Sequence, residues 1–207
     1  AAERMPPDLV LADIALADGS NGVEAAHDIL AEMPTPVIFI TAYPERLLTG
    51  ARPEPTFLIS KPFRPETLHA AMSQALFFRE TAEVARALLP AVRAHDALLF
   101  VNDRADVAAA VGADGVHLGP EDVPVGAIRR AFGPDLLIGY STDDPGTARR
   151  AVEEGADYLG CGAVFGTTSK DVGDEAIGLA ALRAVVEAVD VPVVGIGGVT
   201  PERAASV

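Results

Sequence analysis

Residues 98–124 read LLFVNDRADVAAAVGADGVHLGPEDVP, and the pattern of this stretch predicts the type of fold. It begins with an apolar run, continues through polar residues into an alanine-rich segment with helical spacing, and reaches a second apolar run at 115–118 before a polar turn. Gly112 can end the helical segment, because glycine readily adopts the left-handed conformation at a helix C-terminus. The stretch therefore predicts one strand–helix–strand unit.

The turn inside this stretch occurs twice, as GADGV at residues 112–116 and GADYL at residues 155–159, which indicates an internal repeat of one β/α unit. Apolar runs with little alternation recur along the chain and are typical of strands buried on both faces. We predict strands at Leu9–Ile14, Val37–Thr41, Thr56–Ser60, Ala97–Val101, Gly115–Leu118, Leu136–Tyr140, Tyr158–Val164 and Val191–Ile196. Because helical segments lie between these strands, we predict a parallel sheet.

Eight such units match the strand count of a TIM-type (β/α)8 barrel, so the predicted fold class is α/β with eight parallel β/α units. The alternative is an open, flavodoxin-like parallel sheet assembled from a three-strand piece and a five-strand piece. Residues 65–96 read as one helical stretch that is longer than a barrel helix needs, and Pro90 predicts that it forms two helices, one of them surplus. We place a junction near residues 78–81, which divides residues 1–80 from residues 81–207 within one joint barrel domain.

The composition is that of a globular protein, with 207 residues and a formal net charge of −14. A negative field repels phosphate backbones and anionic lipid, which argues against nucleic-acid and membrane partners. With no apolar run long enough to span a bilayer and no basic-then-apolar leader, we expect a cytoplasmic protein. Cys161 is the single cysteine of the sequence, which excludes an internal disulfide. We expect it to be a small buried residue between glycines. The chain starts in a loop-like segment and stops inside a helix that opens at Thr200, so we expect it to be cut at both ends.

Three polar residues end the first three predicted strands: Asp13, Thr41 and Lys61. The carboxyl ends of parallel strands meet at one edge of a sheet, which is where such sheets bind ligands. A carboxylate nucleophile, a hydroxyl and an ammonium group at that edge could accept a phosphoryl group and neutralise its charge.

The segments that carry these residues resemble the last three β/α units of a response-regulator receiver domain of the alphaproteobacterial general-stress type. They are LVLADIALADGSNGVEAA at 9–26, PVIFITAYPERLLTG at 36–50 and PTFLISKPF at 55–63. The resemblance implies that Asp13 is the phospho-acceptor, Thr41 the switch hydroxyl and Lys61 the contact to the acyl phosphate, followed by a cis bond to Pro62. Receivers also hold Mg²⁺ with an acidic pair on their first strand, and nothing upstream of Leu9 supplies it. We therefore expect these residues to be a vestige of a phospho-acceptor site.

Polar residues and glycines also follow the later strands. Asp103 and Asp122 follow adjacent strands and could together hold one Mg²⁺ that shares a pyrophosphate. Lys170 and nearby hydroxyls add donors for anionic oxygens. Gly197 and Gly198 would let backbone amides approach a phosphate closely before the next helix.

As an ordered set, these segments resemble thiamine-phosphate synthase over essentially all of residues 82–207. They are ARALLPAVRAH at 85–95, the opening stretch at 98–124, LIGYSTDDP at 137–145, GADYLGCGAVFGTTSK at 155–170 and VPVVGIGGVTPE at 191–202. That family joins a hydroxymethylpyrimidine pyrophosphate to a thiazole phosphate on a (β/α)8 barrel, and Mg²⁺ assists the departure of pyrophosphate before the thiazole nitrogen attacks.

The resemblance implies a role for each matching residue. Ser141, near the reacting pyrimidine, and Lys170 would be the catalytic residues. Ser169 stands where threonine is commoner in the family. The implied contacts are Asp103 and Asp122 to Mg²⁺, Asn102 and Lys170 to pyrophosphate, Thr167 and Ser169 to the thiazole ligand, and Gly197 and Gly198 to its phosphate.

Two family features have no counterpart in this sequence. The Gln-Leu-Arg-Glu-Lys motif of the second family strand is absent, since Arg79-Glu80 matches it only by letter and lies in a helical stretch. The last family strand is also missing. Because positioning and charge stabilisation are most of what such a site supplies, we expect activity to fall by several powers of ten. His117, in the middle of a predicted strand, is expected to face the barrel or its helices rather than bind a metal.

Three receiver-like strands and five synthase-like strands add up to eight. Our hypothesis is a chimera without complete native activity that binds phosphate or pyrophosphate and Mg²⁺ weakly at the carboxyl ends of its strands. The alternatives are an active thiamine-phosphate synthase and a phospho-receiver signalling module. Small phosphorylated molecules are the expected ligands, and an unpaired sheet edge would favour a homodimer.

Overall fold

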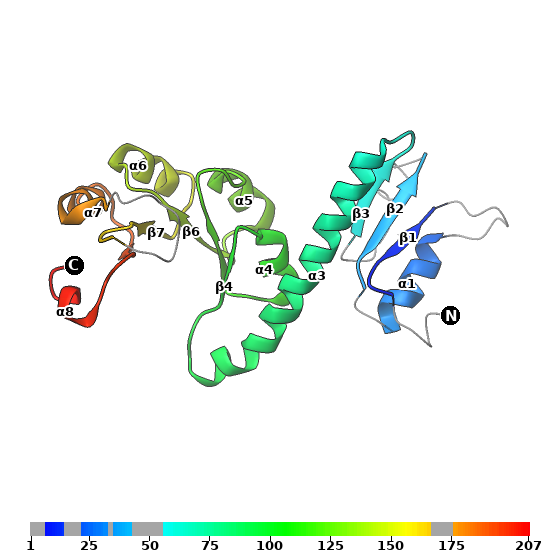
Figure 1. Ribbon diagram of the computed structural model, residues 1–207, viewed down its shortest axis with the longest axis horizontal. Helices are drawn as coiled ribbons and strands as arrows, with labels where there is room; N and C mark the ends of the chain where they lie inside the picture. Colours follow the sequence, from blue (N-terminus) through cyan, green and yellow to red (C-terminus); the bar gives the residue numbers. More distant parts are fainter. Residues whose placement is uncertain (1–6, 15–21, 33–34, 43–55, 167–175) are drawn as a thin grey trace. The chain divides into compact units, whose positions relative to one another are not determined.

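The computed structural model describes residues 7–14, 22–32, 35–42, 56–166 and 176–207. The chain divides into two compact units, Ala1–Ala87 and Leu88–Val207, and both are drawn in Figure 1. The boundary between the units falls inside one long helix. The predicted domain boundary at residue 80 stays a prediction.

The first unit contains a three-stranded parallel sheet with the strand order β1-β2-β3. The strands are β1 (Val10–Ala12), β2 (Val37–Thr41) and β3 (Thr56–Ser60). Helix α1 spans Gly22–Glu32, and helix α3 begins at Pro65. β2 is the central strand and its residues Val37, Ile38 and Phe39 are fully buried, as expected for a strand covered on both faces.

Helices cover both faces of this sheet. Ala26 of α1 packs with Val37 on one face, and Ala75 of α3 packs with Ile38 on the other. Val37 and Ile38 are neighbours in β2, and successive strand residues point to opposite faces. A helix on each face is the layering of the open, flavodoxin-like alternative.

Helix α3 is a single helix over Pro65–Ala94, so the prediction that Pro90 splits it into two helices was wrong. Proline lacks the N–H that would bond to the carbonyl of residue 86. Pro90 lies only four residues before the end of the helix, so the disturbance reaches only its last turn. The helix continues because its preceding turns keep their hydrogen bonds.

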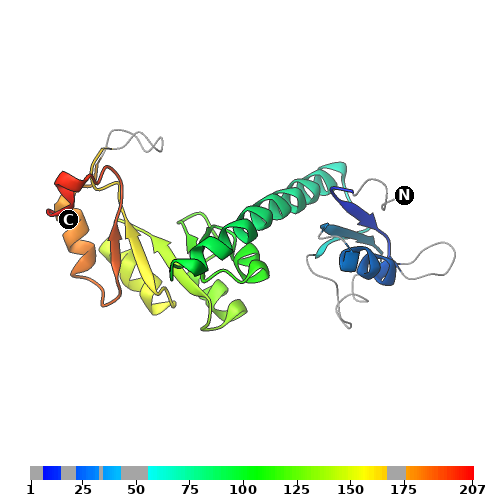
Figure 2. The ribbon, with the colours of Figure 1, turned by 90° about the horizontal axis from the view of Figure 1, so that it is seen from below.

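The second unit contains a five-stranded parallel sheet with the order β4-β5-β6-β7-β8, seen from another side in Figure 2. The elements are β4 (Phe100–Asn102), α4 (Ala105–Val111), β5 (Gly115–Leu118), α5 (Val125–Phe132), β6 (Leu137–Ser141), α6 (Pro145–Glu153), β7 (Tyr158–Cys161), α7 (Gly178–Val186), β8 (Val193–Gly195) and α8 (Pro201–Ala204). The predicted α/β class with eight parallel strands is confirmed. Closure of all eight strands into one barrel stays a prediction.

The two faces of the five-stranded sheet differ in character. One face carries fully buried apolar residues such as Val116, Ile138 and Leu159, and it is the face covered by the helices. The predicted burial of Cys161 is confirmed on this side. The residues that alternate with them, including His117, lie on the opposite face, which we call the inner face.

Glycines on the inner face make room for aromatic rings. A Cβ atom built on Gly139 would lie 2.2 Å from Cζ of Tyr158, and one on Gly115 would lie 2.4 Å from Cε1 of Phe100. Gly139 pairs with Tyr158, and Gly115 pairs with Phe100, in the strand register. Each ring therefore occupies the space that a side chain on the neighbouring strand would need.

The two GAD turns of the repeat use the same clamp at the amino ends of strands. Asp114 accepts a hydrogen bond from the Leu99 N–H (2.7 Å) and pairs with Arg93 (2.7 Å). Asp157 accepts one from the N–H of Ile138 (2.7 Å) and pairs with Arg129 (2.6 Å). Each carboxylate thus ties a strand entrance to the helix that precedes that strand.

No helix in the described ranges is long and apolar enough to cross a membrane.

We predict that Gly139→Ala destabilises the protein by about 1–3 kcal/mol, because the added methyl group overpacks the Tyr158 ring. The measurement is the free energy of unfolding from denaturant titration. Gly126→Ala is the control, since its nearest neighbours are flexible side chains of Arg130 and Glu154 and alanine is the better helix former. Equal stability of Gly139→Ala and the wild type would contradict the packing argument.

We predict that Asp114 contributes pH-dependent stability. Burial opposes its ionisation, but the Leu99 amide and the Arg93 guanidinium outweigh burial and lower the pKa of the carboxyl group. A depressed folded-state pKa means that the contribution is present above the unfolded value of about 3.9 and is lost as pH falls through the lower folded value. Asp114→Asn should cost about 1 kcal/mol near neutral pH, and the gap to the wild type should close in acid. Unfolding titrations across pH 2–7 measure this gap; a gap independent of pH would contradict the assignment.

Candidate functional site

The end of β4 presents Asn102 and Asp103 at the carboxyl edge of the five-stranded sheet. Asp103 has a positive φ of 63°, a left-handed conformation that aspartate tolerates better than most residues. Its N–H donates to the His117 carbonyl (2.8 Å), and its Oδ1 accepts from the Asn102 side-chain amide (2.6 Å). The two predicted site residues are therefore held together at one strand end.

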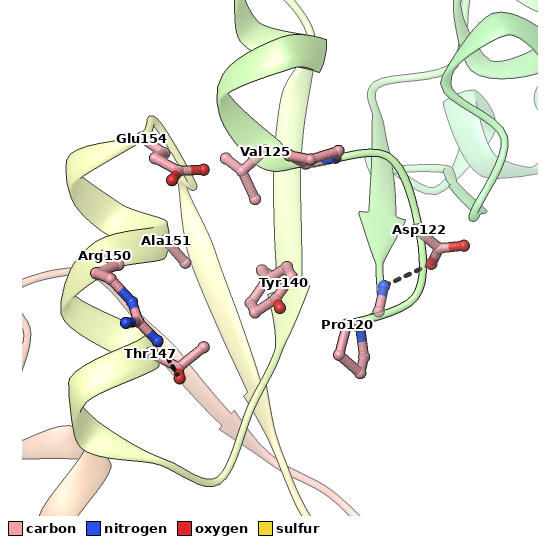
Figure 3. Close-up of a pocket in the computed structure, with 10 residues that line it drawn as sticks. Pro120, Asp122, Val125, Tyr140, Thr147, Arg150, Ala151 and Glu154 are labelled. Carbon is pink, nitrogen blue, oxygen red and sulfur yellow. Dashed lines mark hydrogen bonds between the residues drawn. The ribbon is translucent and has the colours of Figure 1, made fainter.

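Asp122 lies in the turn that follows β5. Its Oδ2 accepts a hydrogen bond of 2.6 Å from the Gly119 N–H, drawn as a dashed line in Figure 3. This bond fixes the carboxylate within its own turn. An ionised carboxylate has about four acceptor positions, so the bond leaves acceptor capacity for a cation.

A cavity of about 200 Å³ lies beside this turn and is lined by Asp122, Tyr140, Arg150 and Glu154 among others. Figure 3 shows these side chains around it, with Arg150 on α6 and Glu154 directly after the end of that helix. Tyr140 precedes Ser141 in β6, so their side chains point to opposite faces of the sheet. Tyr140 lies on the helix-covered face, whereas Gly119 and Asp122 belong to the turn at the carboxyl end of β5, so the cavity adjoins both that face and the carboxyl edge.

Ser141 ends β6 and hydrogen-bonds with His117 of β5, with 2.7 Å between Oγ and Nε2. The other imidazole nitrogen, Nδ1, hydrogen-bonds with the Tyr158 hydroxyl of β7 at 2.8 Å. Burial raises the pKa of Tyr158, which keeps the phenol neutral. His117 thus lies on the inner face of the sheet. Whether that face lines a closed barrel, as predicted, stays a prediction.

Gly197 and Gly198 follow β8 with positive φ angles of 90° and 64°. A Cβ on Gly197 would lie 2.5 Å from the Ala163 Cβ, and one on Gly198 would lie 2.5 Å from the Gly166 carbonyl oxygen. Both glycines are therefore required by the close approach of this loop to the loop after β7. The phosphate contact predicted for them stays a prediction.

The remaining predicted residues of this site, Thr167, Ser169 and Lys170, lie outside the described residues. Within the described ranges, no group of three or more His, Cys, Asp or Glu side chains is placed to hold a metal ion. The Mg²⁺ site of Asp103 and Asp122 stays a prediction.

The first unit brings its three predicted residues to one end of its sheet. Lys61 Nζ lies 2.5 Å from Asp13 Oδ2, and the Lys61 N–H donates to the Thr41 carbonyl (2.8 Å). The Thr41 residue is only 1% exposed. The Lys61-Pro62 peptide bond is cis, as the receiver resemblance implies.

Sequence reasoning missed Arg203. Its guanidinium donates to the Gly198 carbonyl (3.0 Å) and lies 4.9 Å from the centre of the Phe165 ring. The arginine thereby supports the loop that carries the two glycines. Its position one turn after Thr200 in the sequence was the available signal.

A sequence model of the thiamine monophosphate synthase family matches residues 74–207, and the chain belongs to this family. Thiamine-phosphate synthase from Natronomonas pharaonis is 50% identical over 131 residues, which are 62% of this chain and 61% of that protein. The chain spans about three fifths of the length of several curated relatives that it matches.

Two solved structures extend the comparison. Thiamine phosphate pyrophosphorylase from Pyrococcus furiosus has a TM-score of 0.55 and 33% identity, and the match covers 95% of this chain and 77% of that one. The response regulator PhyR from Brucella abortus is 61% identical with a TM-score of 0.37, and that match covers 41% of this chain and 35% of that one. The receiver likeness covers only part of the chain, so the chimera hypothesis stays a prediction.

We predict Mg²⁺-dependent binding of pyrophosphate, because two carboxylates and a pyrophosphate together offer the oxygen ligands that Mg²⁺ prefers. Calorimetry should detect heat at millimolar pyrophosphate with Mg²⁺ and much less without it. Asp122→Asn should weaken this binding about tenfold, which is the usual scale for one lost charge-assisted contact. Identical heats with and without Mg²⁺ would contradict a shared metal site.

Proposed function

We propose that the chain catalyses the thiamine-phosphate synthase reaction, in which a hydroxymethylpyrimidine pyrophosphate and a thiazole phosphate are joined and pyrophosphate is released. The observation that carries this proposal is the placement of Asn102, Asp103 and Ser141 at the carboxyl ends of strands in the unit that matches the family. In parallel α/β folds that edge is where ligands bind.

The donor set at this edge fits the Mg²⁺ that the family resemblance implies. Asp103 and Asp122 would hold the ion, since carboxylate oxygens are hard ligands and Mg²⁺ takes only one or two of them beside substrate phosphates. When bound, the ion would neutralise charge on the departing pyrophosphate.

The residues of this chain would supply positioning. The Asn102 amide donates to Asp103, and a second N–H of the same amide can donate to a pyrophosphate oxygen. The Ser141 hydroxyl, held by His117, would contact the pyrimidine. Lys170, as the family resemblance implies, would balance negative charge as the leaving group departs.

The comparisons favour this activity over the hypothesis of an inactive chimera, because the family match covers residues 74–207. The absent Gln-Leu-Arg-Glu-Lys motif still bears on the rate, since its basic residues grip the pyrophosphate in the family. We therefore propose turnover that is slow relative to synthases that carry this motif. The phospho-receiver alternative rests on the Asp13–Lys61 pair of the first unit.

We also propose that small phosphorylated molecules are the partners and that nucleic acid is not, on the basis of the net charge of −14. The strand order places β4 and β8 at the outside of the described five-stranded sheet. Outer strands can pair with another copy, so we propose a homodimer through such an edge.

The test is an assay with both substrates and Mg²⁺ that measures thiamine phosphate and pyrophosphate. Thiamine phosphate and pyrophosphate should form in equal amounts. Asp103→Asn should lower kcat/KM by roughly 10²-fold or more, as expected when a charge that stabilises the transition state is lost.

Asp135→Asn is the matched control, because Asp135 is exposed and precedes β6, at the amino end of that strand. It should leave kcat/KM unchanged. No product from the wild type at millimolar substrates, or equal effects of the two substitutions, would overturn the proposed function.

A further inference from the structure

A chain of hydrogen bonds crosses three adjacent strands on the inner face of the five-stranded sheet. The Tyr158 hydroxyl on β7, the His117 imidazole on β5 and the Ser141 hydroxyl on β6 are joined at 2.8 Å and 2.7 Å. We call these three residues the Tyr–His–Ser chain. All three are half-buried rather than exposed, so water competes for these bonds only in part.

The sheet leaves room for this chain at two glycines. A Cβ on Gly139 would lie 2.2 Å from the Tyr158 ring, and one on Gly160 would lie 3.1 Å from Cε1 of His117. Gly139 is the register partner of both His117 and Tyr158. The imidazole and the phenol can therefore meet across the strand that separates them.

The aromatic contacts restrict the two rings further. Tyr158 packs edge-to-face with Phe100 at 5.2 Å and 75°, and lies against the His117 ring at 5.5 Å. Edge-to-face contacts at such distances are favourable. The phenol oxygen is thus directed at Nδ1 of His117 by packing as well as by its hydrogen bond.

An imidazole with both nitrogens engaged cannot rotate without breaking a hydrogen bond. A serine hydroxyl at a strand end would otherwise rotate to suit its surroundings. The bond to Nε2 occupies one hydrogen-bonding direction of Ser141 Oγ and leaves the remaining ones for a ligand. The orientation of Ser141 is therefore determined before any substrate arrives.

We propose that His117 is a positioning residue, anchored by Tyr158, that presets the Ser141 hydroxyl for contact with the pyrimidine substrate. This inference rests on the proposed function for its substrate, and on the contacts above for its geometry. Preset groups raise the rate because misplacement of a contact by about 1 Å can cost roughly 10²-fold.

The kinetic test is a double-mutant cycle on Ser141→Ala and His117→Ala. Each should lower kcat by roughly 10- to 100-fold, with little change in the KM for thiazole phosphate. Because His117 acts through Ser141, the double variant should be no worse than Ser141→Ala within about twofold. Losses that multiply would overturn the proposal.

Two conservative variants of His117 distinguish the hydrogen bond to Ser141 from the volume that the imidazole fills. Gln can place its amide near the position of Nε2, whereas Asn reaches only the position of Nδ1. His117→Gln should recover at least about a third of the wild-type kcat on this argument, and His117→Asn should not. Equal rates for these two variants would contradict a bond from Nε2 to Ser141. Tyr158→Phe, which keeps the ring and removes only the hydroxyl, should lower kcat about three- to tenfold.

His95→Gln is the control, because His95 is exposed and bonds only locally to the Ala91 carbonyl. It should leave kcat unchanged. Thermal melting of each variant separates loss of folding from loss of positioning, and Tyr158→Phe decides the case if His117→Ala does not fold.

A spectroscopic measurement separates failure of this inference from failure of the proposed function. In the substrate-free protein, the ¹⁵N resonance of His117 Nε2 should shift in Ser141→Ala and that of Nδ1 should shift in Tyr158→Phe. A wild-type protein that makes no thiamine phosphate would contradict the proposed function only. The two resonance shifts would still show that His117 orients the Ser141 hydroxyl. If the ¹⁵N chemical shifts of His117 are unchanged in both variants, the inference is overturned even if the enzyme is active.

Discussion

The close fit of glycines and aromatic rings on the inner face is the constraint on which the five-stranded sheet depends. Gly139 has no Cβ, and the Tyr158 ring takes that space. With a side chain at position 139, the Tyr158 ring would have to move away from the inner face, and its hydroxyl would lose the hydrogen bond with His117. Packing and site geometry therefore depend on the same residue, because the Tyr158 ring fills the inner face and its hydroxyl anchors the His117 imidazole that holds Ser141.

The carboxylates at the two ends of this sheet have different roles. At the amino ends, Asp114 and Asp157 each clamp a backbone amide and an arginine. At the carboxyl ends, Asp103 accepts a hydrogen bond from the Asn102 amide and Asp122 accepts one from the Gly119 N–H. This division agrees with the general pattern of parallel α/β folds, in which stability residues and ligand-binding residues lie at opposite ends of the strands.

The eight strands could be predicted because each is a local apolar run between turn signals, and the GAD repeat was visible in the letters themselves. The prediction for Pro90 failed because the effect of a proline depends on its distance from the helix end, and the end at Ala94 follows from tertiary context. The predicted strand Tyr158–Val164 ends early at Cys161, since its last residues bond instead to the loop after β8. The two-sided helix cover of the first sheet was offered only as an alternative, because apolar runs do not say which face a helix takes.

The α/β class, the family resemblance and the positions of Asn102, Asp103 and Ser141 at strand ends could be read from the amino-acid sequence, since these features depend on residues close together in the chain. The hydrogen bonds that join Tyr158, His117 and Ser141 follow from the three-dimensional fold and could not be read from the sequence. Tyr158 and His117 are 41 residues apart, and they meet because strand register places both beside Gly139. Register is a property of paired strands, and a shift of one residue would turn each side chain to the other face.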